Sequence, residues 1–232
     1  PLSVESDMLH VAVAHPVPMR GLELLVRKLG RSVAPWVSTD VRVRAWRSQI
    51  YGTPLPARDA ALLGTLGPTL EERLATLEGG TECLLAPSGL AAIALVAFAF
   101  LKTGDEVLLP DNAYGPGVEF ARHELSGWGV VHRFYDPLDP ASLEAAIGAR
   151  TKLVWLEAPG SVTMEFPDLA ALVSIARRRG VTTALDNTWG AGIAFAPFAI
   201  EGGAGGETIA VDVSVQALSK YASGGADVLM GS

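Results

Sequence analysis

The sequence predicts an α/β domain built on a mostly parallel sheet with helices on both faces. From Pro68 onward, short apolar segments alternate with segments of helical periodicity, and each connection is long enough to hold a crossover helix. Of the 232 residues, 49% are apolar and 25 are glycine, which is typical of a globular α/β protein. This length is enough for one large domain, or for one domain and a fragment of another.

The helices are expected from start signals, stop signals and apolar faces. The first begins at a capping box, Thr69 to Glu72, shows Leu70, Leu74 and Leu77 on one face, and ends at Gly79-Gly80. The second is almost entirely apolar and is expected in the interior. The helices that follow the first are predicted at Ser88–Lys102, Gly117–Leu125, Pro140–Ala149 and Leu169–Arg179.

The strands are expected where short apolar runs lie between these helices. Each run is too short for a helix of ordinary length and is rich in Val, Leu or Thr. The predicted strands are Cys83–Ala86, Glu106–Leu109, Val130–Tyr135, Lys152–Glu157, Thr182–Asp186 and Val211–Val215.

Residues 1–66 follow a less regular pattern than residues 67–232 and are assigned to a separate N-terminal segment. Leu22–Leu29 suits a short helix, and Pro54 and Pro56 mark a turn or loop. The chain begins at Pro1 and stops at Ser232 without a terminal element, so we expect it to be part of a longer protein.

Charge and cysteine content exclude several classes of function. A net charge of −7 is a weak argument against nucleic acid or an anionic membrane as partner, and no basic run exceeds Arg177–Arg179. Cys83 is the single cysteine, so no disulfide framework or cysteine-based metal site is expected. The longest apolar run, Leu90–Leu101, falls short of the ~20 residues of a membrane span. Without a visible secretory signal, we expect a cytoplasmic protein.

Four predicted strand ends carry residues that suggest chemistry, because ligands of open α/β sheets bind at the carboxyl ends of strands. Ser88-Gly89-Leu90 opens a helix, where free N–H groups suit a phosphate, although most such serines only cap the helix. Tyr114 lies in a loop of small residues and could cover a planar ligand or simply pack there. Asp186 ends an apolar strand, where it is either a functional acid or a helix cap. Lys220 follows the last strand, and without the other three features it would be interpreted as a surface residue.

Together these four features fit pyridoxal phosphate better than any one of them does alone. That cofactor needs a lysine for its Schiff base, an acid facing its ring nitrogen, an aromatic surface and an anion site. The sequence offers one candidate for each.

The chain also resembles a known family, the Cys/Met-metabolism family of pyridoxal-phosphate enzymes, from about Ala45 to Ser232. The resemblance implies the large domain of fold type I, the aminotransferase-like fold, with a seven-stranded, mostly parallel sheet. The motifs that carry it, in matching order and similar spacing, are Leu77–Gly80, Pro87–Gly89, Asn112–Tyr114, Leu156–Glu165, Asp186–Trp189 and Ser219–Tyr221.

Carried over to this sequence, the resemblance implies a role for each candidate residue. Lys220 is expected to be the Schiff-base lysine and Asp186 the partner of the ring nitrogen. Tyr114 is expected to stack on the ring and to assist Lys220 in moving the substrate proton. The backbone N–H groups of Gly89 and Leu90, which follow Ser88, are expected to hold the phosphate together with the Ser219 hydroxyl. Ser161 is expected near the phenolic oxygen of the cofactor.

Two features resemble the cystathionine β-lyases within that family: the stretch Pro159–Glu165, which contains Ser161, and Trp189. They imply β-elimination of L-cystathionine, or of a related cysteine S-conjugate, to a thiol, pyruvate and ammonia, as part of transsulfuration and methionine biosynthesis. A γ-lyase or γ-synthase activity is the first alternative. A catalytically impaired remnant that folds and dimerises is the second.

Two departures from the family pattern favour that second alternative. Family members carry a Tyr-x-Arg pair that reaches the phosphate of the neighbouring subunit, whereas Leu63 and Thr65 fill this place here, and Tyr51 and Arg58 lie upstream. The family also continues into a C-terminal domain, which the chain is expected to lack. Relatives imply a homodimer or homotetramer, with residues 1–66 as an arm that contributes to the dimer and the active site.

Overall fold

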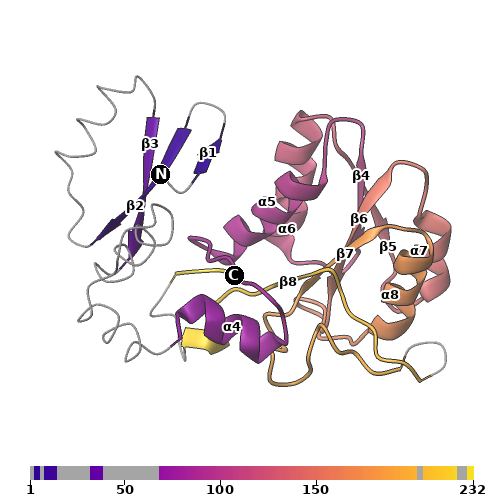
Figure 1. Ribbon diagram of the computed structural model, residues 1–232. Helices are drawn as coiled ribbons and strands as arrows, with labels where there is room; N and C mark the ends of the chain where they lie inside the picture. Colours follow the sequence, from indigo (N-terminus) through magenta and orange to yellow (C-terminus); the bar gives the residue numbers. More distant parts are fainter. Residues whose placement is uncertain (1–2, 6–7, 15–31, 39–67, 203–205, 224–228) are drawn as a thin grey trace. The chain divides into compact units, whose positions relative to one another are not determined.

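The computed structural model describes residues 3–5, 8–14, 32–38, 68–202, 206–223 and 229–232 (Figure 1). The chain divides into two compact units, Pro1–Pro68 and Thr69–Ser232. The predicted helix at Leu22–Leu29, and Tyr51, Arg58, Leu63 and Thr65, lie outside the described residues.

The first unit holds a three-stranded sheet that the sequence reading did not predict. Strand β1 (Ser3–Glu5) pairs antiparallel with β2 (Met8–Ala14), and β2 pairs parallel with β3 (Ser32–Ser38). Pro35 inside β3 lowers the apparent strand propensity of that segment, since proline cannot donate to a ladder. The pairing partner of β2 lies some twenty residues along the chain, where local periodicity gives no signal.

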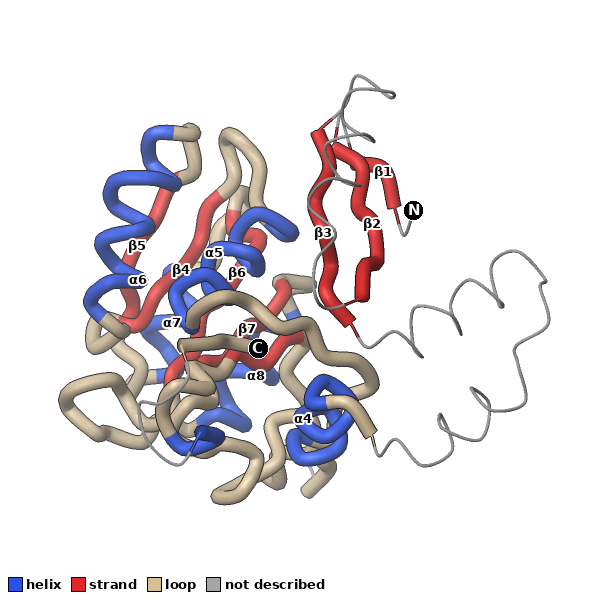
Figure 2. The backbone as a smooth tube through the Cα atoms, turned by 90° about the vertical axis from the view of Figure 1, so that its left-hand side faces the viewer, coloured by secondary structure: helices blue, strands red, loops and turns tan. Residues whose placement is uncertain are grey.

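The second unit is built on a parallel sheet with the order β5-β4-β6-β7-β8, which confirms the predicted α/β class (Figure 2). Its four pairings are all parallel. The described residues thus supply five of the seven strands that the resemblance implies. The strands are β4 (Glu106–Pro110), β5 (Val131–Tyr135), β6 (Thr151–Glu157), β7 (Thr182–Asp186) and β8 (Val213–Val215).

Helices cover both faces of this sheet, as expected (Figure 1). One face carries α5 (Gly89–Phe100) and α6 (Gly115–Phe120), which continues into the π-helix η1 (Ala121–Leu125). The other carries α7 (Pro140–Ala146) and α8 (Leu169–Arg178).

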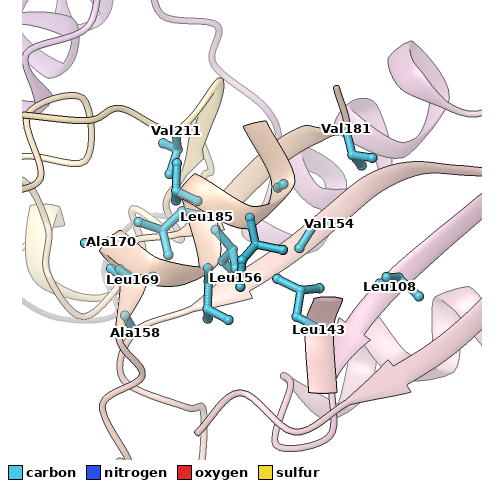
Figure 3. Packing of buried hydrophobic residues seen from close by; sticks show 14 of the residues in the cluster. Leu108, Leu143, Val154, Leu156, Ala158, Leu169, Ala170, Val181, Leu185 and Val211 are labelled. Atoms are coloured by element: carbon cyan, nitrogen blue, oxygen red, sulfur yellow. The ribbon is translucent and has the colours of Figure 1, made fainter. Parts of the chain in front are cut away.

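Successive residues of the central strand β6 point to opposite faces, so that one strand serves two cores. Leu153 and Trp155 pack with residues of α5, whereas Val154 and Leu156 pack with residues of α8. Figure 3 shows the apolar cluster on the α7 and α8 face, in which Leu143 of α7 and Leu169 of α8 approach the strand side chains. Burial on both faces explains why these strands read as continuous apolar runs rather than as alternating ones.

The first helix of this unit, α4 (Leu70–Glu78), has the predicted caps but a different buried face. Thr69 and Glu72 form the capping box, and Gly79 ends the helix with a left-handed φ of 79°. Leu74 is buried as predicted, whereas Leu70 and Leu77 are 45% and 44% exposed. The buried face also includes Ala75 and the carboxylate Glu78.

Two further predictions about secondary structure need correction. Cys83–Ala86 is not a strand of the parallel sheet: Ala86 forms an isolated antiparallel bridge with Gly231, and Pro87 then removes a donor. The apolar helix α5 is not interior all round. It buries Ala92, Ile93, Val96 and Ala97 and exposes Leu90, Leu95, Phe98 and Phe100.

Within the described residues, no helix has the length and apolar character needed to cross a membrane.

A buried ion pair joins three strands of the sheet near their amino-terminal ends. Glu106 at the start of β4 is 3% exposed and accepts two hydrogen bonds from Arg133 of β5, from Nε at 2.7 Å and from Nη2 at 2.8 Å. Thr151 of β6 donates its hydroxyl to the same carboxylate at 2.6 Å. These hydrogen bonds, with Arg133 the largest contribution, hold the pKa of Glu106 below its usual value, although burial opposes them. One carboxylate therefore joins three adjacent strands.

We predict that Arg133→Ala lowers the free energy of unfolding by roughly 2 kcal/mol, because it leaves a buried carboxylate without its cation while Arg133 itself is half exposed. Denaturant unfolding at neutral pH measures the loss. The matched control is Arg178→Ala, which removes an exposed contact with Glu144 at 3.7 Å and should cost about 0 to 1 kcal/mol. Equal losses in the two variants would contradict the role given to the buried pair.

Candidate active site

A cavity of about 160 Å³ opens at the carboxyl ends of the parallel strands. It brings together every residue that the sequence singled out for the site. These eight lining residues are Ser88, Gly89, Leu90, Tyr114, Ser161, Asp186, Ser219 and Lys220. Glu157, Thr188 and Trp189 also line it.

Lys220 faces two aromatic rings across this cavity. Its Nζ lies 5.7 Å from the centroid of the Tyr114 ring and 5.1 Å from that of Trp189. Its backbone N–H donates to the carbonyl of Ala217 at 3.1 Å, in the turn that precedes the short 3-10 helix η2 (Tyr221–Ser223). The turn brings the chain round so that the amine points back over the strand ends, and the two rings provide a surface that attracts a cation.

Asp186 ends β7, where it lies beside Glu157 at the end of β6. Its Oδ1 accepts the backbone N–H of Thr188 at 3.0 Å, as in an Asx turn, and the side chain of Thr188 also hydrogen-bonds to the carboxyl. Burial raises the pKa of the Asp186 carboxyl, whereas the Thr188 donors and the charge of Lys220 lower it. A cation that approached Oδ2 would stabilise the carboxylate that burial disfavours.

The amino terminus of α5 supplies free backbone donors at the same cavity. Ser88 is the N-cap, and its Oγ accepts the N–H of Ala91 at 3.0 Å, so the capping reading of this serine holds. The N–H groups of Gly89 and Leu90 have no acceptor among the described residues. A Cβ on Gly89 would lie 2.7 Å from the Cβ of Ala217, which explains why the helix can approach the exit of β8 only with glycine here.

Glu157 is a site residue that the sequence reading missed. It is 4% exposed, and its Oε1 accepts the backbone N–H of Tyr114 at 2.8 Å and Nε1–H of Trp155 at 3.2 Å. Burial and, to a smaller extent, the neighbouring Asp186 raise its pKa to about 7, against the lowering effects of the two donors and of Lys220. The signal was present in the sequence, since Glu157 ends an apolar strand just as Asp186 does.

Ser161 reaches the cavity on a loop that is joined to the loop of Tyr114. Its N–H donates to the carbonyl of Asn112 at 3.3 Å. The side chain of Asn112 donates in turn to Thr163 at 3.2 Å and to Glu165 at 3.3 Å. Tyr114 and Ser161 are therefore carried by loops that hold each other in place.

The family model described as "Cys/Met metabolism PLP-dependent enzyme" matches residues 66–232. Cystathionine beta-lyase MetC of Escherichia coli (strain K12) is 39% identical over 196 residues, which are 84% of this chain and 47% of that protein. L-methionine gamma-lyase of Pseudomonas putida is 36% identical over 162 residues, which are 70% of this chain and 38% of that protein. The chain thus spans less than half the length of these relatives.

Among solved structures, a Campylobacter jejuni protein described as an O-acetylhomoserine (thiol)-lyase (metY) aligns with a TM-score of 0.60 at 31% identity. The alignment covers 70% of this chain and 38% of that one, and that structure contains N'-pyridoxyl-lysine-5'-monophosphate. Since the family model covers the whole of the second unit and more than half of the chain, and the fold agrees, this chain belongs to the Cys/Met-metabolism family of pyridoxal-phosphate-dependent enzymes.

Proposed function

We propose that the cavity at the strand ends is a pyridoxal-phosphate site and that the protein is a carbon–sulfur lyase. The observation that carries this proposal is the convergence of Lys220, Asp186, Tyr114 and the amino terminus of α5 on one cavity. Each group supplies a different requirement of the cofactor: a covalent anchor, an acid, an aromatic surface and an anion site.

The geometry supports these assignments residue by residue. The buried carboxylate of Asp186, on the cavity wall with Lys220, suits the ring nitrogen of the cofactor. The free N–H groups of Gly89 and Leu90, with the Ser219 hydroxyl on the cavity wall, suit its phosphate. The ring of Tyr114 suits stacking, and Ser161 suits the phenolic oxygen.

Bound pyridoxal phosphate supplies an electron sink for negative charge at the substrate Cα. The protein's own part is proton transfer and positioning. Among the described residues, Lys220 is the only amine side chain on the cavity wall, and it lies close to Tyr114, so it is placed to take the Cα proton, with Tyr114 assisting. Asp186 holds a proton at the ring nitrogen.

For the reaction, we propose β-elimination of L-cystathionine or a related cysteine S-conjugate. The Cα–H and Cβ–S bonds break, the thiol leaves with a proton, and hydrolysis of the remainder gives pyruvate and ammonia. Ser161 and Trp189, both on the cavity wall, support this choice, as does the 39% identity to cystathionine beta-lyase MetC. The second candidate is γ-elimination, which the 36% identity to L-methionine gamma-lyase favours.

Covalent trapping tests the cofactor assignment. When the protein is incubated with pyridoxal phosphate, reduced with borohydride and digested, mass spectrometry should find the phosphopyridoxyl group on the peptide that contains Lys220, because reduction converts an imine to a stable amine. Lys220→Ala should abolish the modification, whereas Lys152→Ala, on an exposed strand position, should not. Absence of the adduct from the wild-type protein would leave the impaired remnant as the better reading.

The carbonyl product tests the reaction. With L-cystathionine as substrate we expect pyruvate and homocysteine, since the Cβ–S bond breaks. Chromatography of the hydrazone derivatives distinguishes pyruvate from 2-oxobutyrate, which γ-elimination would release. Mainly 2-oxobutyrate would replace the first candidate with the second.

The two carboxyl groups at adjacent strand ends differ in what they can bind. Glu157 accepts from the backbone of Tyr114 and the side chain of Trp155, whereas both donors to Asp186 belong to Thr188. Because burial and the neighbouring Asp186 raise the pKa of Glu157, its ionisation disfavours the folded state as pH rises from the ordinary value of 4.5 through about 7.

We predict that Glu157→Gln flattens the pH dependence of the free energy of unfolding in this window. The amide oxygen keeps an acceptor for Tyr114 and Trp155 but does not ionise, so the wild type should lose about 3 kcal/mol relative to the variant between pH 4.5 and 7. Denaturant unfolding of the cofactor-free protein at several pH values measures this. The exposed Glu201→Gln is the control and should leave the wild-type slope intact; an identical slope for Glu157→Gln would refute the assigned titration.

A further inference from the structure

We propose that Glu78 is a positioning residue: its carboxylate ties the exits of β7 and β8 together and so fixes Asp186 relative to Lys220. The proposal rests on the function proposed above for those two residues. Glu78 itself does not line their cavity.

Glu78 is the last residue of α4 and is only 6% exposed. Its carboxylate accepts three side-chain hydrogen bonds from residues more than 100 positions away in the sequence. Asn187 donates from Nδ2 to Oε1 at 2.9 Å, Gln216 donates from Nε2 to the same oxygen, and Ser214 donates its hydroxyl to Oε2. Each donor belongs to β8 or to the residues directly after β7 and β8.

These donors flank the two residues that the site needs. Asn187 follows Asp186 directly, and Gln216 follows the last residue of β8, four positions before Lys220. The two exits also bond to each other: the N–H of Asn187 donates to the carbonyl of Val215 at 2.8 Å, and the N–H of Ala217 donates to the Thr188 hydroxyl at 2.9 Å. Glu78 is the acceptor that these exits share.

Burial makes this arrangement sensitive to the loss of the carboxylate. Asn187 is fully buried and Gln216 is 3% exposed, so neither amide can turn to water for a replacement acceptor. Burial raises the pKa of Glu78, while the donors Ser214, Asn187 and Gln216 lower it. An amide at position 78 would have one acceptor oxygen in place of two and no charge, so the Ser214 hydroxyl would lose its acceptor and would have to turn and accept from the new NH₂ group.

The first test measures the strand exits without cofactor. In Glu78→Gln we expect hydrogen–deuterium exchange at the amides of Asn187 and Ala217 to be about 10-fold faster or more, since their bonds depend on the register of the exits. The control is Glu82→Gln, which makes the same charge change at an exposed residue four positions along. Equal exchange in both variants would overturn the proposal, whether or not the protein binds pyridoxal phosphate.

The second test measures whether loss of the Glu78 carboxylate changes cofactor binding and catalysis at the proposed site. The measurements are made at a temperature at which circular dichroism shows both variants folded. Glu78→Gln should raise the dissociation constant for pyridoxal phosphate by about 10- to 100-fold and should lower kcat with little change in KM. Glu82→Gln should change neither the dissociation constant nor kcat. A lower Tm with unchanged affinity and kcat would show a merely structural role and overturn the proposal. If the wild type binds no pyridoxal phosphate, the proposed function fails, and the exchange result alone decides the role of Glu78.

A milder variant covers the case in which Glu78→Gln does not fold. Ser214→Ala removes one donor to the same carboxylate and leaves the other two. Faster exchange at Asn187 and Ala217 would support the proposal, and unchanged exchange would overturn it.

Discussion

The parallel register of β6, β7 and β8 is the constraint on which the site depends. It sets Glu157 beside Asp186 and Asp186 beside Val215. The segments that leave these strands therefore begin at the same position along the strand direction. A slip of one residue would turn every side chain of a strand to the opposite face. The burial of both faces, in two separate apolar clusters, opposes such a slip. The core therefore determines where the polar groups of the site meet.

A second constraint is the close approach of α5 to the exit of β8. Contact between Gly89 and Ala217 leaves no room for a side chain on the helix, and it places the free N–H groups of the helix next to the turn that carries Lys220. Free backbone donors and the amine of Lys220 thus line one cavity because the backbones of the helix and of the strand exit pack closely. Ser88 contributes by capping the helix, which keeps the first N–H groups directed outward.

The strand-end residues could be predicted from sequence because each stands at a break in a local pattern: an acid after an apolar strand, a glycine opening a helix, a lysine after a strand. Glu157 carries the same signal and was overlooked, whereas Glu78 could not be placed from a local pattern. Glu78 lies on a helix whose apolar face suggested Leu70 and Leu77 as the buried residues, and its partners, Asn187 and Gln216, are distant in sequence. The bridge between Ala86 and Gly231 escaped prediction for the same reason, since pairing partners so far apart leave no trace in local periodicity.

The distribution of charge at the strand ends separates the roles of three buried or partly buried acids. Glu78 is surrounded by donors of the protein, and Glu157 accepts from Tyr114 and Trp155, so both are committed to holding the fold. Asp186 accepts only from the backbone and the side chain of Thr188 among the described residues, and it faces the cavity. Burial raises the pKa of Asp186 although Thr188 and the charge of Lys220 lower it, so burial disfavours its ionised form. A cationic group bound in the cavity would stabilise this carboxylate, since Asp186 lines the cavity wall.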